Sequence, residues 1–192
     1  MNTRMKHRAI HFIIALALGL IATSAFADES KHRIIGIGTA ERPAELREVM
    51  KELPEVHLVA LDVDKAEVTL SYDLAMVFPG TSAFNLKRLT AEEIEKRLDE
   101  KLRRVSQGSF SLKPLCTIPD EQLQRIEIKI AIPDCKGCRL GTYNTLVKMD
   151  GVERCSVSAE GSLLTALIDS TRTNRDALIE ALKKARVQFP TP

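Results

Sequence analysis

The chain has 192 residues, with 28 lysines and arginines against 26 aspartates and glutamates, so its formal net charge is +2. A balance this close to neutral implies no basic surface for nucleic acid. Tryptophan is absent and aromatic residues make up only 4% of the chain, which argues against stacking on single-stranded nucleic acid. The length fits one ordinary domain or two small ones.

Residues 1–27 are predicted to be a signal peptide. Three basic residues precede the apolar run Phe12–Ile21, and Ala25-Phe26-Ala27 is a small-x-small cleavage signal. The apolar run is too short to favour a membrane span, although an uncleaved anchor is the alternative. We therefore expect cleavage after Ala27 and a periplasmic or otherwise extracytoplasmic protein without stable membrane insertion.

The next segment, residues 28–115, is called the first module. Its patterns predict the following order: strand Ile34–Ile37, helix Ala44–Leu53, strands His57–Val63 and Glu67–Tyr72, helix Ala91–Val105 and strand Ser109–Lys113. Thr90 and Glu93 are expected to form a capping box at the last helix.

An insertion, residues 73–89, interrupts the first module. Its apolar members are expected to cover a sheet edge, with ligand binding as the alternative; they are Met76, Val77, Phe78, Phe84 and Leu86. Residues 116–122, with Pro119 among them, are expected to link the first module to a second one.

The second module, residues 123–192, opens with a strand pattern. Apolar and polar residues alternate over Ile126–Ile132, and Pro133 ends the pattern because proline cannot continue a central strand. The elements expected after it are a helix from about Arg139 to Met149, strands Val152–Ala159 and Leu163–Asp169, a helix Arg175–Ala185 capped by Thr173 or Asn174, and a short strand Val187–Phe189. The order is the ferredoxin-like βαββαβ arrangement.

Two thiols lie between the first strand and the first helix of this module. The pattern places Cys135 in a loop and Cys138 in the first helical turn. Helix N-terminal amides and the neighbouring Lys136 favour a thiolate, which binds soft metal ions or attacks a disulfide. Gly137 is expected to let the backbone bend so that both sulfurs reach one ion.

The second module resembles the heavy-metal-associated domain family, of the copper chaperone and mercury-binding periplasmic protein type. The residues that carry the resemblance are Asp134-Cys135-x-x-Cys138, Met149-Asp150-Gly151-Val152 and Ala177–Leu182. The resemblance implies that Cys135 and Cys138 hold a metal ion. It also implies that a metal-transporting ATPase or another thiol-bearing protein accepts the ion.

The chain departs from this family directly before the first cysteine. The family usually has Gly-Met-Thr there, whereas this chain has Ile132-Pro133-Asp134. An acid in that place resembles members that handle divalent zinc, cadmium or lead, so Asp134 is expected to be a third ligand. The cargo stays open among Zn(II), Cd(II), Cu(I) and Hg(II).

An internal repeat relates the two modules. Adding 96 to each residue number superposes Ile34–Asp73 on Ile130–Asp169 without a gap, and the apolar positions coincide. The predicted fold class is therefore α+β, with two tandem ferredoxin-like βαββαβ sandwich domains.

The thiol motif is missing from the first copy. Thr39 and Arg42 stand where the second copy has its cysteines, so the first module is expected to be a degenerate copy that binds no metal. The alternative is that Thr39, Glu41 and Arg42, at a helix N-terminus, contact an anionic group of a partner.

The other thiols and imidazoles are assigned structural roles. Cys155 is expected to point into the core, and a Cys116–Cys155 disulfide is a minor alternative. His32 and His57, the only histidines after the leader, are expected to be solvated strand-end residues.

Three functions are compatible with these residues. The first is an exported metal chaperone or scavenger that transfers its ion by thiol ligand exchange. The second is a thiol-disulfide redox protein that uses the same pair, and the third is a non-enzymatic interaction module with a local disulfide. No set of nucleophile, base and oxyanion donors can be assembled, so no enzymatic activity is expected.

Overall fold

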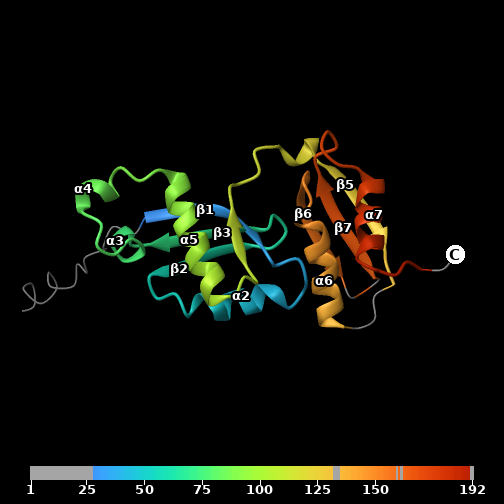
Figure 1. Cartoon of the computed structure of the whole chain (residues 1–192), viewed down its shortest axis with the longest axis horizontal. Coiled ribbons are helices and arrows are strands. Elements are labelled where there is room, and N and C mark those ends of the chain that lie inside the picture. Colours follow the sequence, from blue (N-terminus) through green and yellow to red (C-terminus); the bar gives the residue numbers. More distant parts are fainter. Residues whose placement is uncertain (1–27, 132–134, 159, 161, 191–192) are drawn as a thin grey trace, which may run out of the picture.

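The computed structural model describes residues 28–131, 135–158, 160 and 162–190. The predicted signal peptide and its cleavage site lie outside the described residues, and so does Asp134. Two antiparallel sheets lie side by side, the first module on the left of Figure 1 and the second on the right. Helix α6 (Lys136–Leu146) of the second module lies on the side that faces the first module.

The first module is built on a four-stranded antiparallel sheet in the order β2-β3-β1-β4. Its elements are β1 Asp28–Ile35, α2 Arg42–Met50, β2 Val56–Asp62, β3 Glu67–Tyr72, α3 Leu74–Val77, α4 Ala83–Leu86, α5 Ala91–Val105 and β4 Ser111–Lys113. Strand order and element order together are those of the ferredoxin-like fold, which confirms the predicted fold class. The capping box of Thr90 and Glu93 is confirmed as well.

The second module has the same order with a weaker last strand. Its sheet is β5-β7-β6, and its elements are β5 Gln124–Lys129, α6 Lys136–Leu146, β6 Val152–Ser158, β7 Leu163–Ile168 and α7 Arg175–Lys184. The strand predicted at Val187–Phe189 is reduced to one bridge between Ala131 and Gln188. Pro190 follows at once and has no amide hydrogen to donate, so the pairing cannot extend along it.

The pairing registers follow the repeat found in the sequence. Val56 pairs with Tyr72 in the first sheet, and Val152 pairs with Ile168 in the second, each number raised by 96. The boundaries of the two modules and of the 116–122 linker remain predictions. Within that segment a single 3-10 turn, Asp120–Gln122, pairs its first residue with Arg154 of β6.

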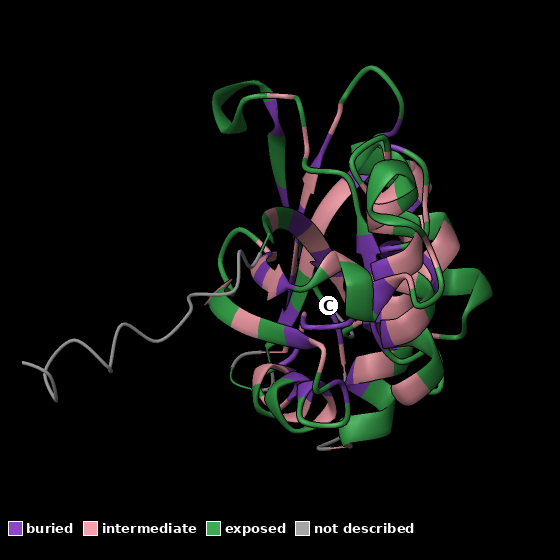
Figure 2. Cartoon of the chain, turned by 90° about the vertical axis from the view of Figure 1, so that its left-hand side faces the viewer, coloured by how far each residue is buried: buried purple, intermediate pink, exposed green. Residues whose placement is uncertain are grey.

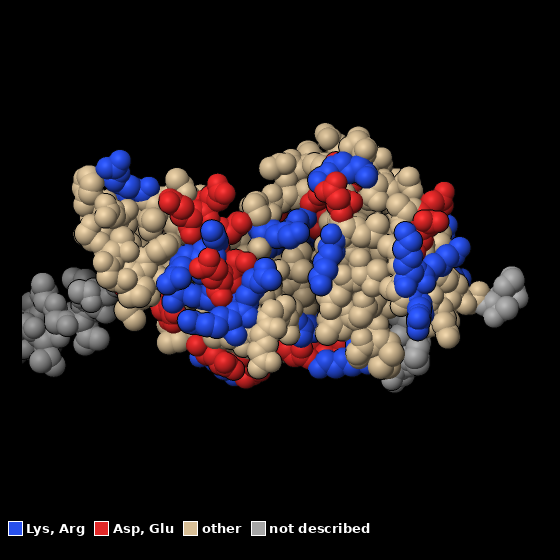
Figure 3. Space-filling model, viewed as in Figure 1, with Lys and Arg blue, Asp and Glu red and all other residues tan. Residues whose placement is uncertain are grey.

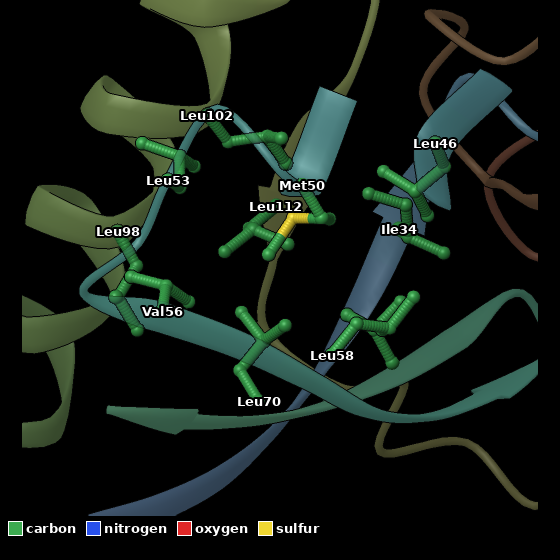
Figure 4. A pocket seen from close by; sticks show the side chains of 11 residues that line it. Ile34, Leu46, Met50, Leu53, Val56, Leu58, Leu70, Leu98, Leu102 and Leu112 are labelled. Carbon is green, nitrogen blue, oxygen red and sulfur yellow. The ribbon is translucent and has the colours of Figure 1, made fainter. Parts of the chain in front are cut away.

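Each sheet packs its apolar face under helices, and each module has its own core. Figure 2 looks along the molecule from the first-module end and shows the buried residues gathered between sheet and helices. The first core leaves a void of only about 10 Å³ among apolar side chains such as Met50, Leu70 and Leu98 (Figure 4). A space of that size is at the lower limit for one water molecule and offers no polar partner, so it is no ligand site.

The insertion only partly matches its prediction. Val77 is fully buried, and Phe78 packs against the first core. Met76 and Phe84 are 59% and 68% exposed, so the expectation that all five apolar residues cover the sheet is wrong for these two. The reason is local: α3 and α4 are single short turns, and only one side of a turn can face the core.

No helix in the described parts of the chain is long and apolar enough to cross a membrane.

Candidate metal centre

The two thiols lie at the start of α6, as the sequence predicts. Cys135 is the N-cap residue, and its Sγ accepts a hydrogen bond from the backbone N–H of Cys138 at 3.2 Å. Cys138 is in the first helical turn and is exposed, whereas Cys135 is half-buried. Helix amides therefore point toward the sulfur of Cys135, which is the geometry that stabilises a negative charge.

The two thiols differ in their acidity. A hydrogen bond from the Cys138 side chain, together with the backbone amides of Cys138 and Gly137, lowers the pKa of Cys135. The same hydrogen bond to Cys135 raises the pKa of Cys138. When the pair loses one proton, the negative charge therefore favours the sulfur of Cys135 over that of its exposed neighbour.

The role predicted for Gly137 is wrong. It has ordinary helical geometry, and a Cβ placed on it would meet only Cys135 Sγ, at an ordinary 3.9 Å. The bend between the thiols comes instead from Cys135, whose extended backbone (φ −134°, ψ 110°) precedes the helix.

A groove of about 390 Å³ opens beside Cys138. One wall is formed by residues of α6, namely Gly141, Thr142 and Thr145. The other is formed by the segment that follows α7, Ala185, Arg186, Val187 and Gln188, together with Ala131. The groove gives the exposed thiol an open approach, which an incoming ligand needs.

Further metal ligands are not found in the described residues. No group of three or more histidine, cysteine, aspartate or glutamate side chains that could hold an ion occurs within 28–131, 135–158, 160 and 162–190. The predicted third ligand, Asp134, falls outside those ranges. The described donors at this loop are therefore two sulfurs, and two thiolates favour soft ions.

The remaining cysteines are unpaired, so the Cys116–Cys155 disulfide is not formed in the structure. The thiol of Cys116 donates to the carbonyl of Ile118, while that of Cys155 donates to the carbonyl of Tyr143. Burial raises the pKa of Cys155 to about 12, and its packing against the second core agrees with the predicted inward position. Such a thiol is a poor nucleophile and a poor metal ligand.

One histidine was assigned the wrong environment. His57 is exposed as expected, but His32 is only 5% exposed and lies between two polar partners. Its Nε2 is 2.6 Å from Ser30 Oγ, and its Nδ1 is 3.1 Å from Glu95 Oε2. These contacts join β1 to α5, and the partner on α5 is 63 residues away, beyond the reach of local patterning.

The loop of the first module that corresponds to the thiol loop is buried. Thr39 and Arg42, at the positions matching Cys135 and Cys138, are each 5% exposed. Arg42 donates to the carbonyls of Gly36 and Ser109, both at 2.7 Å, and lies 3.9 Å from the centre of the Phe110 ring. The alternative that Arg42 binds an anionic partner is therefore wrong, because its guanidinium is used inside the module.

This buried loop docks the first module onto the second. The Gly36 N–H donates to Tyr143 Oη at 2.8 Å, and the Val157 N–H of edge strand β6 donates to the Gly38 carbonyl at 2.7 Å. Gly38 lies so close to the Tyr143 ring and the Cys155 carbonyl that no side chain fits there. This interface was not predicted from the sequence. The only local indication of it is the pair of glycines, Gly36 and Gly38, spaced two residues apart.

Charged pairs complete the interface. Glu41 pairs with Arg139 and Glu45 pairs with Lys136, so two carboxylates of the first module reach the residues that flank the thiols. On the face of the molecule that Figure 3 draws, charges of both signs are interspersed, and both signs are present at the junction. The two modules therefore meet at the candidate metal centre.

Comparisons with known proteins give structural similarity alone. No protein-family model and no curated protein matches the chain. Two solved structures are similar over 84% of the chain: the water-soluble region of the P-type ATPase CopA from Bacillus subtilis, at 17% identity with a TM-score of 0.33, and the N-terminal soluble domains of Bacillus subtilis CopA, at 16% with a TM-score of 0.32. The chain covers 89% and 91% of them, respectively. Scores this low support no inference about function, which is drawn below from the site itself.

Proposed function

We propose that the chain is an exported metal-binding protein that holds one soft or borderline ion on Cys135 and Cys138. The observation that carries the proposal is the thiol pair at the start of α6, with one sulfur supported by helix amides and the other exposed beside an open groove. Sulfur ligands select copper(I), mercury(II), cadmium(II) or zinc(II) over hard cations. A chaperone or scavenger of the heavy-metal-associated type is the function this arrangement fits best.

Transfer would proceed by exchange of thiol ligands. Uptake of the ion would release the protons that the two thiols carry, since the metal binds thiolates. A thiolate of an acceptor, such as a metal-transporting ATPase, could enter through the groove and bind the ion as Cys138 leaves and takes up a proton. The bond to Cys135 would break last, because Cys138 is exposed beside the groove whereas Cys135 is half-buried.

A metal titration tests this proposal. The reduced protein should bind one equivalent of copper(I) or zinc(II) in competition with a chelator of known affinity, and Cys135→Ser with Cys138→Ser should bind none. The matched control is Cys116→Ser with Cys155→Ala, which keeps the proposed site and removes the other two thiols. Equal binding by the site variant and the wild type would overturn the proposal.

Thiol-disulfide exchange is the second candidate. The observation in its favour is the unequal acidity of the pair, since a thiolate beside a protonated thiol is suited to attack a disulfide. An anaerobic count of thiols in the protein as isolated separates the two candidates. Two reactive thiols on the pair favour metal binding, while a disulfide that cycles with a defined potential favours redox exchange.

A further inference from the structure

Two glutamates of the first module lie against the two cationic residues that flank the thiols. Glu41 pairs with Arg139, whose side chain is 8% exposed, and Glu45 pairs with Lys136, whose side chain is 55% exposed. Hydrogen bonds at its own backbone and from Arg139 lower the pKa of Glu41, and a hydrogen bond from Lys136 lowers that of Glu45, so both carboxyls are ionised at neutral pH.

The docked loop holds these carboxylates in place. Gly38 fits closely against the second module, and Gly36 and Gly38 each share a short hydrogen bond with it, 2.8 Å to Tyr143 and 2.7 Å from Val157. The helix that carries Glu45 starts directly after this loop. The negative charges are therefore a fixed part of the metal centre's surroundings, although they belong to the module that has no thiols.

Glu41 and Glu45 offset positive charge beside the thiols. Lys136 and Arg139 flank the thiols, and the field of Arg139 reaches Cys135. Arg42 adds a further positive charge, because it pairs with Glu45 at 2.6 Å. Soft metal ions travel either as cations or as anionic complexes with chloride or thiols, and a positive site attracts the anionic forms. Glu41 and Glu45 weaken that preference by supplying two negative charges at the same place.

We propose that Glu41 and Glu45 limit the enrichment of anionic metal complexes at Cys135 and Cys138 and so favour the access of cationic metal species. The inference rests on the proposed function where it concerns metal species, but the effect of the two carboxylates on charged reagents at the thiols does not depend on metal binding. The first module thereby acts on the chemistry of the second without contributing a ligand.

Alkylation with two reagents of different charge tests the electrostatic core. Iodoacetate is anionic and iodoacetamide is neutral, and the same thiolate reacts with both. The ratio of the two rates therefore does not depend on the fraction of the thiol that is ionised or on the accessibility of the sulfur. Glu41→Gln with Glu45→Gln should raise that ratio at Cys135 about threefold at 10 mM salt, roughly the effect of one further unit charge at about 7 Å in water. The rise should vanish in 1 M salt, where the screening length is about 3 Å.

Two variants serve as controls. Glu48→Gln, on the same helix but paired with the exposed Lys51, should leave the ratio at the wild-type value. Glu41→Asp with Glu45→Asp keeps both charges and should also stay close to the wild type. An unchanged ratio in the Gln variant, or a rise that persists in 1 M salt, would overturn the proposal.

Metal uptake gives the second measurement. The Gln variant should take copper(I) faster than the wild type from its anionic bicinchoninate complex and more slowly from the cationic acetonitrile complex. A wild type that binds no metal while the alkylation ratio shifts as expected would refute the metal-binding function and support the charge effect. If the wild type binds metal but the Gln variant changes neither the alkylation ratio nor the uptake rates, the metal-binding function is supported and the charge effect is refuted.

Discussion

The two corresponding loops of the repeat lie in opposite environments. In the second module the loop ends in two thiols, one exposed and one half-buried, beside an open groove. In the first module the matching positions, Thr39 and Arg42, are buried, and the loop is pressed against its neighbour. The same turn between strand and helix thus leaves a thiol open to solvent in one module and docks onto the neighbouring module in the other. Accessibility, as well as residue type, decides whether such a loop can handle an ion.

The largest expected effect comes from moving the thiols to the other loop. Thr39→Cys with Arg42→Cys, in a chain that lacks Cys135 and Cys138, should bind no metal because both positions are buried. Loss of Arg42 should also cost about 2–4 kcal/mol of unfolding free energy, since two carbonyls lose their donor. Chelator competition on protein shown to be folded by circular dichroism is the measurement, and wild-type affinity would contradict the comparison.

A pair of glycine variants tests the docking itself. Gly38→Ala should lower the unfolding free energy by about 1–3 kcal/mol, because the new methyl group overlaps the Tyr143 ring. Gly141→Ala is the matched control on the helix that carries Tyr143; its Cβ would meet nothing, and it should be neutral or stabilising by up to about 1 kcal/mol. Urea denaturation followed by circular dichroism compares them. Equal losses would mean that Gly38 is not closely packed.

A substitution at Asp134 tests whether its carboxylate is a third metal ligand beside the two thiols. If its carboxylate binds the ion, Asp134→Ala should weaken zinc binding about tenfold, or about 1.4 kcal/mol, because zinc wants four ligands. Copper(I), satisfied by two thiolates, should bind nearly as before. Competition titrations of both ions measure the ratio. If the ratio does not move, Asp134 leaves the ligand set and the thiol pair stands.

The smallest expected effect is the loss of unfolding free energy when acid protonates the two glutamates at the contact between the modules. Carboxyls with a lowered pKa stabilise the folded state above their unfolded value, near 4.5, and that contribution disappears as the pH falls through the folded pKa. Glu41 and Glu45 should therefore add less than about 1 kcal/mol at neutral pH, and lose it below about pH 4.5. Unfolding free energies of the wild type and of Glu41→Gln with Glu45→Gln, compared at pH 7 and pH 4, should differ less at the lower pH. A gap that stays constant would assign the effect to packing.

Local patterns in the sequence predicted the elements well, because periodicity and capping are properties of neighbouring residues. Strand β3 and helix α5 have their expected bounds, and the thiols occupy the predicted positions. Helix α2 begins earlier than expected, at Arg42, since Pro43 is tolerated in a first turn.

The sequence could not show what depends on distant partners. Burial of His32 needs Glu95, and the charge balance at the thiols needs Glu45, 91 residues before Lys136. These contacts arise only when α5 packs on its sheet and when the two modules meet. The sequence shows that the loop of the first module lacks cysteines, but its docking contacts depend on the orientation of the second module.

The hydrogen bond from Val157 to Gly38 also bears on how the protein keeps from aggregating. Strand β6 is the edge of its sheet, and an open edge invites another chain to add a strand. Gly38 covers part of that edge, and the absence of a side chain lets its backbone approach closely. A substitution that undocked the first module would therefore bare the edge to intermolecular pairing.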